Sequence, residues 1–190
     1  MMVISLAVIL ACAPPEVAPE TIQAVIRVES GGDALAVGIN LPGQPSRAVH
    51  PANLAEAMAL AQDTQAQGGS IDLGLMQVNS RNLPRLGMGL PQMFGPCANI
   101  RAGAAILQED YGRALRVAPA GQPALRAALS AYNTGDFARG FGNGYVARYE
   151  VAKTVNLRIG AFKASSSVFH RTDGNIGLEN GQSAHDDARK

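Results

Sequence analysis

The chain has 190 residues, of which 47% are hydrophobic and 5% aromatic, and its formal net charge is +1. This length suits one domain with a substantial core and is short for two. A charge near zero without a basic cluster argues against a nucleic-acid binder, which normally shows a basic stripe. Abundant Ala and Gly, few aromatics and no Trp predict a mainly α fold of closely packed helices.

Residues 2–11 are an apolar run that is too short to cross a membrane. They are either the core of a secretory signal, with a lipoprotein-like box at Ile9–Cys12, or a helix that packs on the domain. No Lys or Arg precedes the run, which argues against a signal. We therefore separate an N-terminal segment (1–11), a domain (12–160) and a tail (161–190) that we expect to be disordered, because it is polar without periodicity.

The chain has two cysteines, Cys12 and Cys97. An exported protein would join them if the geometry allowed, and such a bridge is worth on the order of 4 kcal/mol. The alternative is two buried free thiols. We expect the disulfide.

A short helix is predicted from Pro19, a favourable first residue, to the Gly31-Gly32 pair. Its apolar stripe of Ile22, Val25 and Ile26 continues to Glu29, so a carboxyl group stands where another apolar residue is expected. Burial and the helix dipole both favour the neutral acid, so we expect a raised pKa and a general acid. The alternative is a Glu29 that reaches into solvent.

The middle of the chain alternates loops with short elements. Residues 33–47 are rich in Gly, Pro and Asn and are predicted to be a surface loop. A helix opened by Pro51 should run through 54–61 and end near Gly68-Gly69. Residues 70–80 should be extended or turn-like, and residues 81–97 should be a loop or a broken short helix.

The second half is predicted to be helical. Asn99 should cap a helix over 100–111, whose small residues would let another helix come close. Pro123 should open a helix that carries Tyr132 and ends at Gly135. A last helix is predicted from Tyr145 to about residue 158.

No metal or cofactor site is expected, because the three His residues show no paired spacing. A G-x-S-x-G nucleophile elbow is also missing from the sequence. What remains are polar clusters at the ends of apolar elements: Glu29-Ser30, Gly74-Leu-Met-Gln77-Val-Asn79 and Ala131-Tyr132-Asn133.

In this order the clusters resemble the lytic transglycosylase catalytic domain, which is related to goose-type lysozyme. The resemblance covers about residues 12–150. Further matches resemble the branch of this family that is found in type IV secretion and conjugation systems. They are Gly38-Ile-Asn40, Ser70-Ile-Asp72, Asn79-Ser-Arg-Asn82, Pro96-Cys97-Ala-Asn99-Ile100 and Gly144-Tyr145-Val146.

The resemblance implies a lysozyme-like single domain with a short extended segment beside a cleft for peptidoglycan glycan strands. It makes Glu29 the sole catalytic acid and base, and has Ser30 hydrogen-bond to Glu29 or to the sugar. The remaining substrate-binding residues carried over by motif are Met76, Gln77 and Asn79 on the cleft floor, Tyr132 and Asn133 at the acetamido group, and Tyr145.

A single carboxylate decides the expected chemistry. Ordinary glycosidases need two carboxylates, and the one other candidate in these motifs, Asp72, is expected to be locked in a turn. The substrate would then supply its own nucleophile and close a 1,6-anhydro ring without water. The alternatives are a hydrolytic lysozyme that uses Asp72, and a non-catalytic glycan-binding assembly factor.

The resemblance also implies that the protein is periplasmic or is exported to the cell envelope. There it would open the wall locally for a secretion or conjugation apparatus, with components of that apparatus as further partners. We expect a monomer.

Overall fold

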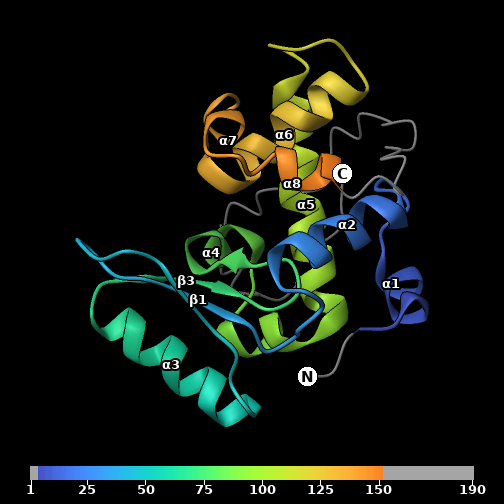
Figure 1. Ribbon diagram of the computed structural model, residues 1–190. Helices are drawn as coiled ribbons and strands as arrows, with labels where there is room; N and C mark the ends of the chain where they lie inside the picture. Colours follow the sequence, from blue (N-terminus) through green and yellow to red (C-terminus); the bar gives the residue numbers. More distant parts are fainter. Residues whose placement is uncertain (1–3, 152–190) are drawn as a thin grey trace, which may run out of the picture.

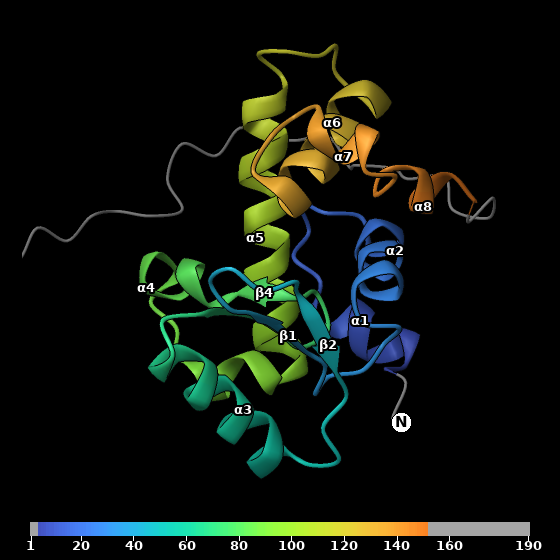
Figure 2. The ribbon, with the colours of Figure 1, turned by 60° about the vertical axis from the view of Figure 1, so that its left-hand side comes forward.

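The computed structural model describes residues 4–151. A long helix, α5 (Pro96–Ala114), runs through the centre, and the other elements surround it (Figures 1 and 2). Helix α6 packs along the C-terminal half of α5, with α7 and α8 nearby. Helices α1 and α2 lie on one side of α5, and a small sheet with α3 lies around the N-terminal half of α5. The remaining helices are α1 (Leu6–Cys12), α2 (Pro19–Glu29), α3 (Leu54–Ala66), α4 (Leu83–Leu86), α6 (Gln122–Thr134), α7 (Arg139–Gly142) and α8 (Ala147–Val151), with 3-10 turns η1 (Ser80–Asn82) and η2 (Leu90–Phe94).

The sheet is antiparallel, with strand order β2-β1-β3-β4. Its strands are β1 (Val37–Asn40), β2 (Arg47–Val49), β3 (Ser70–Leu73) and β4 (Val78–Asn79). The extended segment predicted at 70–80 is confirmed as β3, a turn and β4. The loop predicted at 33–47 is wrong, because β1 and the start of β2 lie within it.

Helices α2, α3 and α6 appear where the sequence predicts them, and α6 ends at Gly135. The predicted cap of the central helix is wrong. Helix α5 begins at Pro96 with Gly95 as its N-cap, so Asn99 lies inside the first turn. Asn99 is fully buried, and its side chain bonds to other parts of the chain.

The small residues of α5 accommodate a loop as well as a helix. An added Cβ at Gly103 would lie 2.7 Å from Met76 Cβ and Sδ, so the side chain of Met76 occupies the space that Gly103 leaves. Helix α6 also packs on α5. The predicted approach of a helix is therefore only part of the reason for these small residues.

The predicted last helix begins two residues later than expected, as α8 at Ala147, and a separate short helix precedes it. Residues Arg139–Gly142 form α7, Tyr145 precedes α8, and the rest of the prediction, like the predicted tail, lies outside the described residues.

Residues 6–12 form α1, which packs on α5 and α2 with Ile9 and Cys12 buried. A disulfide joins Cys12 to Cys97 at the start of α5. The expected bridge is therefore present in the structure. Within residues 4–151, none of the helices combines the length and apolar content needed to cross a bilayer.

Candidate active site

Glu29 is the last residue of α2, and Ile22, Val25 and Ile26 on the same helix are buried in the core. The apolar stripe therefore turns Glu29 inward, although its side chain is half-buried and not fully buried. Burial raises the pKa of Glu29 from 4.5 to about 7, and the Asp72 carboxylate adds to this rise. The Tyr145 hydroxyl and the Arg148 guanidinium oppose it. A carboxyl group with this pKa holds a proton at neutral pH for much of the time.

Residues just before and within α8 enclose the Glu29 carboxyl group. Tyr145 donates its hydroxyl proton to Glu29 Oε1, and the hydroxyl oxygens of Tyr145 and Tyr149 are 2.7 Å apart. Arg148 donates from Nη2 to the carbonyl of Val28, so it holds the last turn of α2. These contacts bring residues about 120 positions apart to one acidic group.

Residues Gly74–Gln77 form the turn between β3 and β4. Gln77 has a left-handed backbone (φ 48°), and its Nε2 donates to the carbonyls of Ala36 and Gly74 at 3.1 and 2.8 Å. A left-handed conformation is costly for a residue with a side chain, so the surroundings must impose it.

Asn99 supplies much of that constraint from inside α5. Its Oδ1 accepts from Met76 N at 2.8 Å, and its Nδ2 donates to the carbonyls of Leu73 and Met93 at 2.7 and 2.8 Å. Ser30 adds a second fixing point, because its hydroxyl lies 2.8 Å from the carbonyl of Leu75. The turn is thereby tied both to the central helix and to the end of α2.

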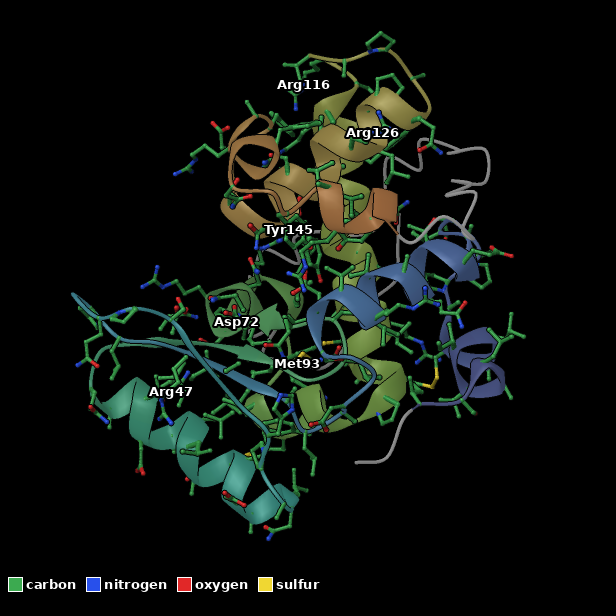
Figure 3. All side chains as sticks on the ribbon, viewed as in Figure 1. Arg47, Asp72, Met93, Arg116, Arg126 and Tyr145 are labelled. Carbon is green, nitrogen blue, oxygen red and sulfur yellow. A yellow bond between two sulfur atoms is a disulfide. The ribbon has the colours of Figure 1, made fainter. Side chains whose placement is uncertain are left out.

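Asp72 lies on strand β3, opposite Gly38 on one side and Asn79 on the other. Its two carboxylate oxygens accept hydrogen bonds from Asn40 Nδ2 at 2.8 Å and Asn79 Nδ2 at 2.7 Å. Burial raises the pKa of Asp72, while these two amides lower it. The expectation that Asp72 is locked in a turn is wrong. Figure 3 shows Asp72 on the sheet side and Tyr145 on the α8 side of the same central region.

A cavity of about 550 Å³ extends from this region. It is lined by polar groups of the sheet, α4, α5 and the end of α6, among them Asp72, Gln77, Asn79, Tyr132 and Asn133. Glu29 is not among the residues that line the cavity, whereas Tyr132 is. The negative charge of Glu29 helps to raise the pKa of Tyr132. The carboxyl group therefore lies within electrostatic range of a residue that lines the cavity.

A family model described as the transglycosylase SLT domain matches residues 8–154. The chain belongs to this family. The lysozyme-like, mainly α fold expected from the motifs is thereby confirmed. No solved structure matches the chain.

The similar proteins carry the name virB1, which for the Brucella protein is given as a type IV secretion system protein. The type IV secretion system protein virB1 of Brucella abortus is 44% identical over 131 residues, which is 68% of this chain and 53% of that protein. The virB1 proteins of Agrobacterium fabrum and Rhizobium radiobacter are 43% and 39% identical over 141 residues, 74% of this chain and 56% and 57% of those proteins. The chain thus spans about half the length of these relatives, and the expected resemblance to the type IV secretion branch is confirmed.

In this SLT domain the motif residues divide into two groups. Asp72, Gln77, Asn79, Tyr132 and Asn133 line the cavity, whereas Ser30, Met76 and Tyr145 do not. The Met76 side chain is fully buried, so its predicted place on the cleft floor is wrong. Ser30 is also buried, and the hydrogen bonds of its hydroxyl group are to the backbone at Ile26, Gly32 and Leu75, in place of the predicted bond to Glu29 or the sugar.

Tyr132 lines the cavity, but its hydroxyl proton is used within the protein. The hydroxyl donates to the carbonyl of Met76 at 2.7 Å. Its oxygen can still accept a hydrogen bond from a substrate in the cavity.

Sequence reasoning assigned no role to Arg148 and Tyr149, and it gave Asn99 only the role of a helix cap. A signal for Tyr149 was present, because it lies four residues after Tyr145 and would share its face in a helix. Among residues 4–151, no group of three or more His, Cys, Asp or Glu is placed to hold a metal ion.

Proposed function

We propose that this SLT domain is a murein lytic transglycosylase that cleaves the β-1,4 bond between N-acetylmuramic acid and N-acetylglucosamine. The observation that carries the proposal is the half-buried carboxyl group of Glu29, with a pKa of about 7, whose charge is felt at the lining of a polar cavity. A general acid works best when its pKa lies near the working pH. Membership of the SLT family supports murein as the substrate.

In the first step, Glu29 gives its proton to the glycosidic oxygen as the bond to C1 of the muramic acid breaks. The sugar's acetamido group stabilises the positive charge that develops at C1. Tyr132 and Asn133, which line the cavity, are suited to hold that group. The carboxylate of Glu29 is left hydrogen-bonded to Tyr145.

In the second step, the Glu29 carboxylate takes the proton of the sugar's C6 hydroxyl, whose oxygen bonds to C1. The product is a 1,6-anhydro ring, Glu29 is protonated again, and no water is consumed. One carboxyl group therefore serves as acid and then as base.

A second candidate is a lysozyme-like hydrolase, and the placement of Asp72 favours it. Asp72 lies on a strand that borders the cavity, and its charge acts on Glu29. Two amides donate to its oxygens, which helps to keep the group ionised. A second carboxylate in such a position could activate water or stabilise the cationic sugar.

We infer that the enzyme acts in the periplasm or on the cell envelope, where it opens the wall for a type IV secretion or conjugation apparatus. The printed name of the Brucella abortus relative, a type IV secretion system protein, supports the link to such an apparatus, and the Agrobacterium fabrum relative shares the name virB1. A non-catalytic glycan-binding factor is the remaining alternative, although it would have no use for a buried acid.

Replacement of Glu29 by Gln tests the catalytic proposal. The amide has nearly the same shape but cannot supply the proton, so release of soluble fragments from purified murein should fall by at least about 10²–10⁴-fold. A folded Glu29→Gln protein that digests murein like the wild type would refute the proposal. If the Glu29→Gln protein still sediments with murein in a pull-down assay, its binding to the substrate is intact.

A further inference from the structure

Two tyrosines form a hydrogen-bonded chain that ends on Glu29. Tyr145 contacts Glu29 Oε1, and its hydroxyl lies 2.7 Å from that of Tyr149. Both side chains are buried, with 4% and 6% of their surface exposed, and their rings meet edge to face with centroids 5.4 Å apart. The packing fixes both rings, so the two hydroxyls are held in place before substrate binds.

The number of protons fixes the direction of this chain. A phenol has one O–H, so when Tyr145 donates to the ionised Glu29 its oxygen can only accept from Tyr149. When Glu29 is protonated, the acid can donate to Tyr145, and Tyr145 can then donate to Tyr149. The pair can therefore satisfy both protonation states of Glu29 by turning two hydroxyl groups.

Several other groups face Glu29. The Arg148 guanidinium lowers its pKa and the Asp72 carboxylate raises it, while the hydroxyl of Tyr132 is engaged by the carbonyl of Met76. Arg148 also lies over the Tyr145 ring, with its guanidinium carbon 5.8 Å from the ring centroid. Tyr149 differs from these groups because it acts on Glu29 through the Tyr145 hydroxyl.

We propose that Tyr149 is a positioning residue for the catalytic acid, which orients Tyr145 and, through it, stabilises the Glu29 carboxylate formed when the glycosidic oxygen takes the proton. Hydrogen bonds in a chain strengthen one another, and bonds to a charged acceptor are the stronger ones. The stabilisation therefore grows as charge develops on Glu29, which is what acceleration of the first step requires. This inference rests on the proposed role of Glu29.

Tyr149→Phe keeps the ring and removes the terminal donor. We expect kcat on murein to fall about three- to tenfold with little change in KM, which is the usual effect of one hydrogen bond. Because the carboxylate loses stabilisation, the alkaline limb of the kcat/KM profile should move to higher pH. The pKa of Glu29, followed by carbon-13 NMR of its carboxyl group, should rise with it.

Tyr111→Phe is the matched control. Tyr111 is also 6% exposed, and its hydroxyl accepts a hydrogen bond from the backbone of Gly121 at 3.1 Å. This variant should lose stability but keep the wild-type pH profile. A purely structural role for Tyr149 predicts the same behaviour for Tyr149→Phe.

Site-specific replacement of Tyr149 by 3-fluorotyrosine gives a test of opposite sign, which also serves if Tyr149→Phe does not fold. Fluorine makes the hydroxyl a stronger hydrogen-bond donor. The pKa of Glu29 should therefore fall, and the alkaline limb of the kcat/KM profile should move to lower pH. Unchanged limbs and an unchanged Glu29 titration in the altered proteins would overturn the inference. If Glu29→Gln is active as well, the proposed function fails. If Glu29→Gln is inactive, only the proposed role of Tyr149 fails.

Discussion

At the scale of single residues, the half-buried carboxyl group of Glu29 is a costly feature of the fold. Its pKa of about 7 lies above the ordinary value of 4.5, so the folded state binds a proton more tightly than the unfolded chain does. Its contribution to stability is therefore complete below pH 4.5 and is lost as the pH rises through about 7. Catalytic need and stability oppose each other at this position.

Glu29→Gln should for this reason stabilise the protein at pH 8. The neutral amide needs no proton, so its melting temperature should exceed that of the wild type at pH 8, and the difference should shrink towards pH 4. Thermal melts of both proteins across this range measure the effect. A constant difference at every pH would show that burial does not shift the pKa of Glu29.

Tyr132 illustrates how a structure changes the expected effect of a mutation. Its hydroxyl donates to the carbonyl of Met76, so Tyr132→Phe removes a tie between α6 and the turn Gly74–Gln77. We expect a loss of about 1 kcal/mol in the free energy of unfolding, together with a lower kcat. Urea unfolding and murein digestion measure the two effects, and unchanged stability would contradict the assigned bond.

At the scale of elements, Asn99 joins the central helix to the turn beside the cavity. Asn99→Ala would leave Met76 N and the carbonyls of Leu73 and Met93 without this partner. Each buried group left unsatisfied costs about 1–3 kcal/mol. We expect a loss of several kcal/mol in urea unfolding, and a turn that no longer holds Gln77.

Asn53→Ala is the control for this variant. Asn53 is an exposed N-cap of α3, and its Oδ1 accepts from the backbone of Glu56 at 3.0 Å. Its loss should cost only about 1 kcal/mol. Equal losses for the two variants would show that Asn99 is an ordinary helix cap.

The elements also show what sequence patterns could predict. Helices α2 and α6 carry regular apolar stripes and clear end signals, and both were predicted, as was the burial of Glu29. Strand β1 has four residues and includes Gly38, so no alternating pattern marks it. A side chain at Gly38 would crowd the site, because an added Cβ would lie 3.1 Å from Asp72 Oδ2 and from Gln77 Oε1.

The errors within the site have a common physical cause. The roles predicted for Ser30 and Met76 place their side chains towards substrate, but both side chains are buried in the protein. The Ser30 hydroxyl and the Tyr132 hydroxyl both bond to the backbone of residues 75–76. Motif spacing identifies residues that gather around a site. It does not separate those that touch substrate from those that support them, because that depends on contacts distant in sequence.

At the scale of the whole molecule, the disulfide fixes α1 to the start of α5 across 85 positions of sequence. Loss of a bridge that closes so long a loop costs about 2–5 kcal/mol. Reductant should therefore lower the melting temperature of the wild type and leave a Cys12→Ala/Cys97→Ala protein unchanged. Two titratable thiols in protein purified from an oxidising compartment would contradict the bridge.

The central claim is that one carboxyl group, Glu29, breaks the glycan bond without water, while Asp72 only holds charge and hydrogen bonds on the sheet. Mass spectrometry of murein digested in ¹⁸O-labelled water, by the wild type and by Asp72→Asn, tests this claim most directly. The account predicts muropeptides that end in 1,6-anhydro-muramic acid, lighter by one water than hydrolysis products, unlabelled and resistant to borohydride, from both proteins. Labelled reducing ends from the wild type that disappear in Asp72→Asn would contradict it and identify a two-carboxylate hydrolase.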